Sequence, residues 1–205
     1  MKKVIAPLLA GLYVAASMPP WGWWPLAFLG LAIYTSLATR PDNTSPFRTA
    51  SIFFSAWFLP AMAWMWFLTA PGYVIAALLF SALHGIAAMI TAAVTDQHKH
   101  RAVVGPLAHT LAEALRFSFP FGGVPLATLA ISQAASPIAP IVRIGGPLLL
   151  TYIVLQIGFL LTRLRDTETP NRSVHAALIA VVVVILPIVG SIAPHGHNIG
   201  RSLNV

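Results

Sequence analysis

The 205-residue chain contains no cysteine and few charged residues. The lack of cysteine excludes disulfide bonds, thiolate metal sites and a cysteine nucleophile within these residues. Charged residues make up 8% of the chain and hydrophobic residues 58%, whereas an ordinary soluble domain carries about 25% charged residues. The composition therefore predicts one compact integral membrane domain.

Acidic residues are scarcer than basic ones, 5 against 12, which gives a net charge of +7. A nucleic-acid partner would require a basic face on a soluble fold. Here the basic residues fall in the short gaps between apolar runs, so we expect no nucleic-acid binding. Lys and Arg near helix ends instead mark the cytoplasmic side of a membrane protein.

Seven apolar runs divide the sequence, and most approach the roughly 20 residues that span a bilayer core as a helix. The runs comprise residues 4–18, 21–39, 47–69, 73–95, 102–117, 141–162 and 173–193. The first and the fifth are short. About 15 residues rise only about 22 Å as a helix, so the first run requires local bilayer thinning or snorkelling of Lys2 and Lys3. The sequence predicts an all-α integral membrane protein with a bundle of about seven transmembrane helices.

Basic residues are distributed unevenly over alternating gaps. Nine lie on one side of the expected membrane: Lys2, Lys3, Arg40, Arg48, Lys99, Arg101, Arg163, Arg165 and Arg172. Three lie on the other side: Arg116, Arg143 and Arg201. Because the more basic side faces the cytoplasm, we expect a multi-pass plasma-membrane protein with a cytoplasmic N-terminus and an extracytoplasmic C-terminus.

The N-terminal run has two interpretations. Two lysines before an apolar run that ends in Val14-Ala15-Ala16 are compatible with a cleaved signal peptide over residues 1–16. Alternatively, Pro19-Pro20 ends a first transmembrane helix, and tryptophans anchor the next helix among the lipid headgroups, where indole rings concentrate. The expected interfacial anchors are Trp21, Trp23 and Trp24.

Glu113 is the only acidic residue inside any of the apolar runs. A carboxylate in hydrocarbon is costly unless it is paired or faces a wet cavity, so this position is a candidate functional site. His109, Glu113 and Arg116 are spaced so that they share one face of a helix. Two interpretations stay open: Glu113 and Arg116 neutralise each other for packing, or they line a cavity that holds a polar headgroup.

Residues 118–140 carry four prolines, which exclude a regular helix. Irregular backbone at membrane depth persists only where it is buried in protein or lines an aqueous cavity, so we expect an irregular or re-entrant outer loop. A pair of glycines in the loop either permits close approach to a ligand or forms a simple turn. The candidate lipid-binding residues are Glu113, Arg116, Phe119, Pro120, Gly122, Gly123, Ser132, Gln133 and Arg143.

Other polar residues give weaker signals. His84 lies within the fourth run and is expected to be a hydrogen-bonded residue of the bundle. His195 and His197 lack a third ligand, so we expect no metal site and no cofactor. The sequence contains no Gly-x-Ser-x-Gly elbow, Walker loop or His-Glu-x-x-His motif. No catalytic residue is therefore assigned.

Three stretches resemble the N-terminal membrane domain of the apolipoprotein N-acyltransferase family, in a form similar to actinobacterial members. They are residues 18–27 (MPPWGWWPLA), residues 113–133 with EALR, FPFGGVP and SQ, and the pairs Ser136-Pro137 and Gly145-Gly146. The likeness covers essentially the whole chain, although only the second stretch is specific. Leu126 stands where the family usually has a tryptophan.

The resemblance implies an eight-helix membrane bundle with a periplasmic nitrilase-like domain between the seventh and eighth helices. In such proteins a Glu-Lys-Cys triad of that domain transfers an acyl chain from phospholipid to the N-terminal cysteine of a lipoprotein. We accordingly expect a transmembrane domain over residues 1–202, with 203–205 as the apparent start of the missing nitrilase-like domain. Because a thioester mechanism requires a thiolate, this fragment is expected to be inactive alone.

The expected partners are phospholipid and lipoprotein acyl chains, together with the nitrilase-like domain. Two other functions stay open. The resemblance to actinobacterial members also suggests a membrane anchor for a glycosyltransferase, polyprenol-phosphate-mannose synthase, docked on the basic cytoplasmic side. A small transporter would instead use His84, Glu113 and Arg116 along its pathway. The reading frame downstream of Val205 distinguishes the acyltransferase from the anchor.

Overall fold

The computed structural model describes residues 2–40, 42–94, 98–119, 123, 125–165 and 172–193. These residues form α-helices and short 3-10 turns, and no strand occurs among them, which confirms the all-helical class. The α-helices are α1 (Lys2–Ala16), α2 (Pro25–Ala38), α3 (Pro46–Ala61), α4 (Ala70–Val94), α5 (His98–Arg116), α6 (Val142–Arg165) and α7 (Arg172–Ile192). The 3-10 turns are η1 (Ala63–Phe67), η2 (Ile131–Gln133) and η3 (Ala139–Ile141).

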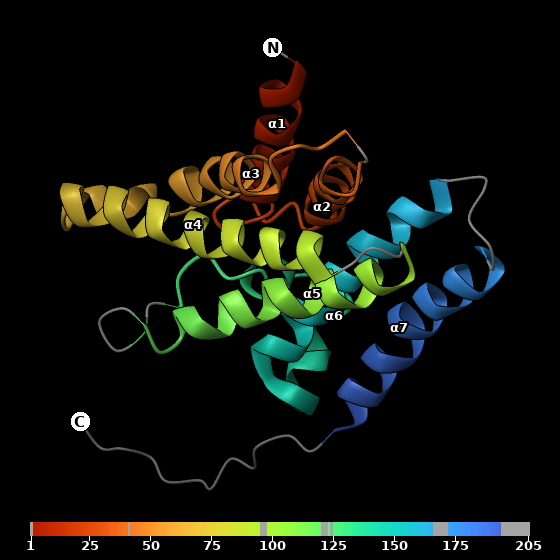
Figure 1. The fold of residues 1–205 in the computed structure, drawn as a ribbon. Helices are drawn as coiled ribbons and strands as arrows, with labels where there is room; N and C mark the ends of the chain where they lie inside the picture. Colours follow the sequence, from red (N-terminus) through yellow and green to blue (C-terminus); the bar gives the residue numbers. More distant parts are fainter. Residues whose placement is uncertain are drawn as a thin grey trace, which may run out of the picture.

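Six helices form a closed circuit of packing contacts, here called the helix ring. Along this circuit α1 packs against α2, α2 against α6, α6 against α5, α5 against α4, α4 against α3, and α3 against α1. Figure 1 shows α4 and α5 side by side near the middle of the molecule and α7 at its edge. Helix α7 packs outside the ring, against α6 and η3.

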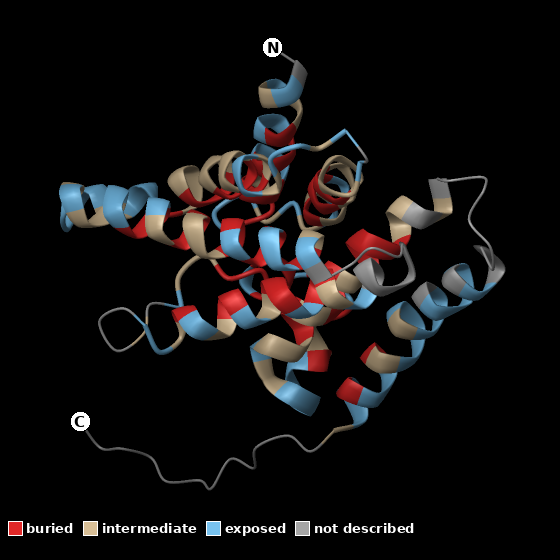
Figure 2. Cartoon of the chain, in the orientation of Figure 1, coloured by how far each residue is buried: buried red, intermediate tan, exposed pale blue. Residues whose placement is uncertain are grey.

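Aromatic side chains fill the interior of the ring. Tyr34 of α2 stacks on Phe53 of α3 with ring centroids 4.3 Å apart, and Phe54 and Trp57 continue the cluster along α3. All four are buried. Figure 2 shows buried residues concentrated where helices face each other and exposed residues along most of α7. The core therefore lies between α2, α3 and α4, next to the polar face of α5.

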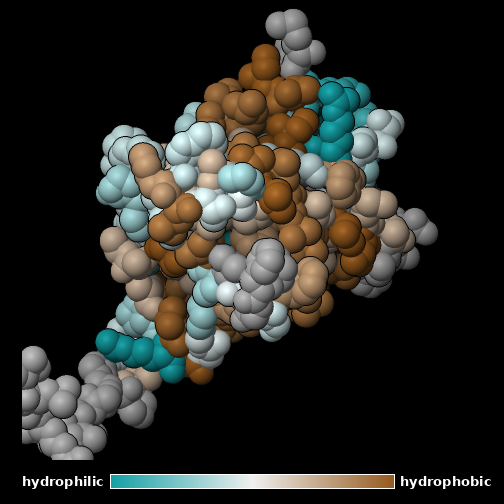
Figure 3. Space-filling model, turned by 90° about the vertical axis from the view of Figure 1, so that its left-hand side faces the viewer, coloured by the Kyte–Doolittle hydropathy of each residue, from teal (hydrophilic) through white to brown (hydrophobic). Residues whose placement is uncertain are grey.

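The outer surface of the molecule is rich in large apolar side chains, which suits a membrane protein. Examples on α7 are Leu178, Val184 and Ile188, each about half exposed. Figure 3 shows apolar atoms over much of one face. Among the described residues, Ala70–Ala93 and Ala139–Thr162 are helical stretches long and apolar enough to cross a bilayer. Seven transmembrane helices therefore remain a prediction, although seven α-helices are observed.

Several helix boundaries differ from the apolar runs. Helix α1 ends at Ala16, and the third run divides into α3 and η1 after Ala61, close to Pro60, which has no backbone N–H to donate. Helix α5 begins at His98, so the helix is longer than the short fifth run. Its first turn is polar but helical, because helix formation depends on the backbone and not on hydropathy alone.

Helix α6 contains a sharp change of direction at Gly145 and Gly146. Gly146 has φ 72°, a left-handed conformation that favours glycine, and Pro147 follows it. Proline disfavours the helical conformation in the residue that precedes it. The bend separates Arg143 from the rest of α6.

Candidate functional site

Glu113 and Arg116 form a buried ion pair on α5. Arg116 Nη1 donates to Glu113 Oε2 at 2.9 Å, and the two side chains are 0% and 1% exposed, respectively. The backbone N–H of Leu129 donates to Glu113 Oε1, also at 2.9 Å. Each carboxylate oxygen therefore accepts a hydrogen bond, one from a helix side chain and one from the irregular segment that follows α5.

Arg116 has three further contacts. Its Nη2 donates to the carbonyl of Leu126, and its Cζ lies 4.5 Å from the ring centroid of Phe58 and 4.2 Å from that of Phe80. A guanidinium over aromatic faces gains about 2 kcal/mol when it is desolvated. Arg116 Nε makes no hydrogen bond with the described residues. The pair thus attaches α5 to the backbone of residues 126–129 on one side and to the aromatic core on the other.

The described part of the 118–140 segment is irregular, as predicted from its prolines. Ser132 Oγ donates to the Leu129 carbonyl at 2.6 Å. Gln133 Nε2 donates to Ser132 Oγ at 2.9 Å and to the carbonyl of Trp24 at 3.4 Å. Both side chains are buried. Their hydrogen bonds therefore tie the segment to the start of α2, inside the protein.

Three of the other candidate lipid-binding residues are described by the structure. Phe119 is 55% exposed, and Arg143 is exposed on the short turn before the bend in α6. Gly123 has φ 105°, and a Cβ at this position would collide with the Phe117 carbonyl, so only glycine fits. Pro120 and Gly122 lie outside the described residues, as do the C-terminal histidines.

The three tryptophans before α2 occupy the surface to different extents. Trp21 is 54% exposed and Trp23 is 59% exposed. Trp24 is half-buried and packs edge to face against Phe28, with ring centroids 6.2 Å apart. Their role as interfacial anchors remains a prediction.

Two histidines extend the polar cluster beyond the ion pair. His84 Nδ1 and His109 Nδ1 are 3.1 Å apart, and His84 Nε2 lies 3.8 Å from Glu113 Oε2. His109 Nε2 is 3.0 Å from the hydroxyl of Tyr34. The His84 ring also stacks on Phe54, with centroids 3.9 Å apart. His84 is therefore a hydrogen-bonded residue of the bundle, as its position within an apolar run indicated.

Tyr34 and Phe54 belong to this cluster but were not identified from the sequence. Both come from helices other than α4 and α5, and the period of one helix says nothing about its neighbours. The contacts of the Leu126 carbonyl and the Leu129 N–H could not be predicted either, because backbone groups of this kind occur throughout the sequence. A buried tyrosine hydroxyl usually finds a partner, but the sequence does not show which one.

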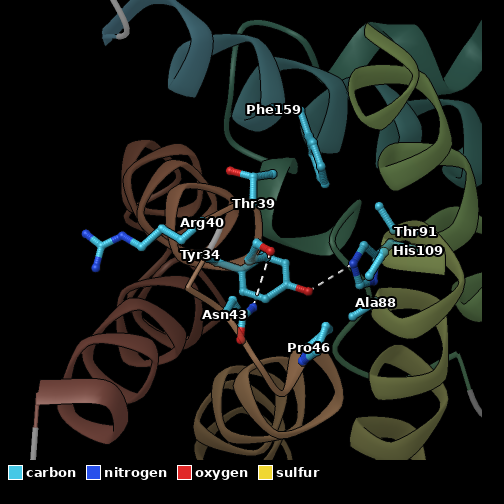
Figure 4. A pocket seen from close by; sticks show the side chains of 11 residues that line it. Tyr34, Thr39, Arg40, Asn43, Pro46, Ala88, Thr91, His109 and Phe159 are labelled. Atoms are coloured by element: carbon cyan, nitrogen blue, oxygen red, sulfur yellow. Dashed lines mark hydrogen bonds between the residues drawn. The ribbon is translucent and has the colours of Figure 1, made fainter. Parts of the chain in front are cut away.

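A pocket of about 120 Å³ opens next to Tyr34 and His109, between α2, α4 and α5. Figure 4 shows the Tyr34 hydroxyl directed at the His109 ring, with Thr91 and Phe159 nearby. Arg40 and Asn43 also line the pocket, and the Arg40 side chain extends away from Tyr34. The pocket therefore brings a largely apolar cavity with a few polar side chains to one end of the buried cluster.

Fold and site together define an α-helical domain of membrane-protein type, with a buried ion pair that holds an irregular segment. Within the described ranges no group of three or more His, Cys, Asp or Glu side chains is arranged to hold a metal ion. A family model, the apolipoprotein N-acyltransferase N-terminal domain, matches residues 10–160. The chain belongs to this family, as the resemblance indicated. The match includes Tyr34, His84, His109, Glu113 and Arg116.

Proposed function

We propose that this chain is the membrane domain of an apolipoprotein N-acyltransferase and binds phospholipid or lipoprotein acyl chains at residues 118–140. The observation that carries the proposal is the Glu113–Arg116 pair, which bonds the backbone at Leu126 and Leu129. The family match over residues 10–160 supports it, because this family model is named for apolipoprotein N-acyl transfer.

The ion pair holds the backbone of the irregular segment at Leu126 and Leu129. Burying two charges costs several kcal/mol for each ion, which is offset only by good geometry and further hydrogen bonds. Here the further bonds come from backbone groups that no regular helix satisfies. Phe119 and Ile131, on either side of these two leucines, are 55% and 39% exposed. Exposed apolar side chains next to a backbone held by the ion pair suit contact with acyl chains.

The chemical step is assigned to a group outside residues 1–205. Acyl transfer through a thioester requires a thiolate, and these residues contain no cysteine. The purified chain is therefore expected to yield no triacylated product from a diacylated lipopeptide, as measured by mass spectrometry. Product that depends on the purified chain would contradict this assignment.

Photo-cross-linking tests the lipid site. The chain is placed in nanodiscs that contain a phospholipid with a photoreactive acyl chain, and labelled peptides are quantified by mass spectrometry. Labelling is expected to concentrate at residues 118–140 and to fall by about half or more in Phe119→Ala and Ile131→Ala, because each change removes exposed apolar surface.

Leu178→Ala is the matched control, since Leu178 is also apolar and half-exposed but lies on α7. It is expected to leave the labelling of residues 118–140 unchanged. Equal labelling of α7 and of residues 118–140 would indicate ordinary surrounding lipid and would overturn the proposed site.

A further inference from the structure

Four titratable side chains lie in a row through the helix ring. They are Tyr34 of α2, His109 of α5, His84 of α4 and Glu113 of α5. The facing atoms of successive members are 3.0, 3.1 and 3.8 Å apart. None of the four is more than 2% exposed. One end of the row borders the pocket in Figure 4, and the other end is the ion pair with Arg116.

The donors in this row can all point the same way. A carboxylate only accepts, and a neutral imidazole has one N–H and one acceptor nitrogen. His84 therefore directs its Nε2–H toward Glu113, which leaves His84 Nδ1 to accept from His109 Nδ1–H. His109 Nε2 then accepts from the Tyr34 hydroxyl. This assignment orients each donor from the pocket toward Glu113, and within the described residues only the His84 Nε2–H, 3.8 Å from Glu113 Oε2, makes no hydrogen bond in the row.

We propose that the row Tyr34–His109–His84–Glu113 is a proton-transfer path from the pocket to the Glu113 carboxylate. The Tyr34 oxygen takes a proton from a hydronium ion in the pocket, and its own hydroxyl proton passes to His109 Nε2. The His109 Nδ1 proton passes to His84 Nδ1, and the His84 Nε2 proton passes to Glu113 Oε2. One proton is moved, no electron is transferred, and both imidazoles end in the opposite tautomer.

The pocket supplies the entry to the path. Its volume of about 120 Å³ has room for several water molecules, each of which occupies about 30 Å³ in the liquid. Thr39, Thr91 and Asn43 line it with polar groups, and Tyr34 forms part of its wall. Tyr34 and His109 both belong to the pocket lining, whereas Glu113 does not, so a proton in the pocket meets the row at its Tyr34 end.

The link between His84 and Glu113 controls the path. At 3.8 Å it is longer than a hydrogen bond, and the other two links are not. Glu113 is held in place by Arg116 and by the N–H of Leu129. Besides Glu113 itself, Arg116 is the charged side chain that contacts the row. A small shift of the carboxylate toward His84 closes the link. The arrival of a proton then weakens the bonds that fix residues 126–129.

Time-resolved infrared spectroscopy tests the path. The full chain in nanodiscs is taken rapidly to acid pH, and the carbonyl band of the protonated carboxyl group is followed. Loss of this band in Glu113→Gln assigns it to Glu113. In Tyr34→Phe and His109→Phe the rate at which the band rises is expected to fall about tenfold or more, because general acid–base relays contribute at least this much to proton transfer. The final amplitude of the band is expected to stay the same.

Tyr152→Phe is the control, because Tyr152 is a half-buried tyrosine of α6 outside the row. It is expected to leave the rate unchanged. Circular dichroism checks the fold, and Tyr34→Phe decides alone if the histidine variant does not fold. An unchanged rate in Tyr34→Phe would overturn the path, as would the absence of any Glu113-dependent band wherever the fold is retained. No lipid substrate is used, so the result is independent of the proposed acyl-chain site.

Discussion

Arg116 is a charged side chain in the centre of an apolar protein, and its surroundings show how it is accommodated. It is 0% exposed, faces one carboxylate and one backbone carbonyl, and contacts the rings of both Phe58 and Phe80. Only the carboxylate carries an opposite charge. The stability of this part of the protein therefore depends on Glu113 more than on any single apolar contact of Arg116.

Replacement of Glu113 by alanine is expected to destabilise the protein more than replacement of both charges. Glu113→Ala leaves Arg116 without its carboxylate, and breaking a buried pair in this way costs about 3–5 kcal/mol. The double variant Glu113→Ala/Arg116→Ala removes the uncompensated charge and is expected to recover a large part of that loss. Thermal unfolding in detergent, followed by circular dichroism, measures the difference.

Thr110→Ala is a suitable control for this comparison, because Thr110 lies on the same helix and bonds only the carbonyl of Pro106 in its own helix. It is expected to behave like the parent. If Glu113→Ala has the same melting temperature as the double variant, or the same as the parent, then Arg116 does not need the Glu113 carboxylate as its partner.

The pairing of Glu113 with Arg116 could be predicted because both lie on one helix, where spacing alone fixes their distance. The same argument placed His109 on that face. Helix spacing could not predict that His109 contacts His84 and Tyr34, because those contacts depend on how α2, α4 and α5 pack. Ser132 and Gln133 were named as candidate lipid-binding residues; the structure shows both hydrogen-bonded inside the protein, and lipid binding by them stays a prediction.

The helical class was predictable, and the ends of the helices were less so. Hydropathy located seven apolar runs, and within the described residues each run overlaps one α-helix. The polar start of α5 and the division between α3 and η1 escaped the prediction, because apolar content does not report backbone hydrogen bonding. Hydropathy also does not predict how closely two helices pack. Small residues at the contacts control that distance.

Gly30 of α2 allows close packing against α1. A Cβ at this position would lie 2.5 Å from the carbonyl oxygen of Ala10 and 2.7 Å from Cγ2 of Val14. Gly30→Val is therefore expected to force the two helices apart and to destabilise the protein by about 1–3 kcal/mol, the usual cost of overpacking. Thermal unfolding measures this loss.

Leu29→Val is the control, since Leu29 is on the same helix and 47% exposed. Its melting temperature is expected to stay close to that of the parent. Equal effects of the two substitutions would mean that the contact between α1 and α2 tolerates expansion.

The helix ring is a property of the whole chain that no local pattern encodes. Its closure joins α2 to α6, where the Thr35 hydroxyl donates to the carbonyl of Gly158 at 3.2 Å and also bonds Thr162. The orientation of the ring in a membrane is a separate question. It depends on where the basic residues fall, and nine against three of them favour a cytoplasmic N-terminus.

Reporter fusions test this orientation. Alkaline phosphatase is active outside the cytoplasm, whereas green fluorescent protein fluoresces inside. Fusions at Thr69, Ala135 and Val205 are expected to give phosphatase activity, and fusions at Lys99 and Arg165 are expected to fluoresce. High phosphatase activity at Lys99 or Arg165 would reverse the assignment.

The order of synthesis gives the ion pair a further significance. Because α6 closes the ring, α5 leaves the ribosome before its enclosure exists. A charge whose partner lay on α6 would stay unpaired until that helix had been synthesised. Glu113 and Arg116 are three residues apart on one helix, so they can pair as soon as α5 forms. The charges of α5 are thus neutralised before the rest of the site has been made.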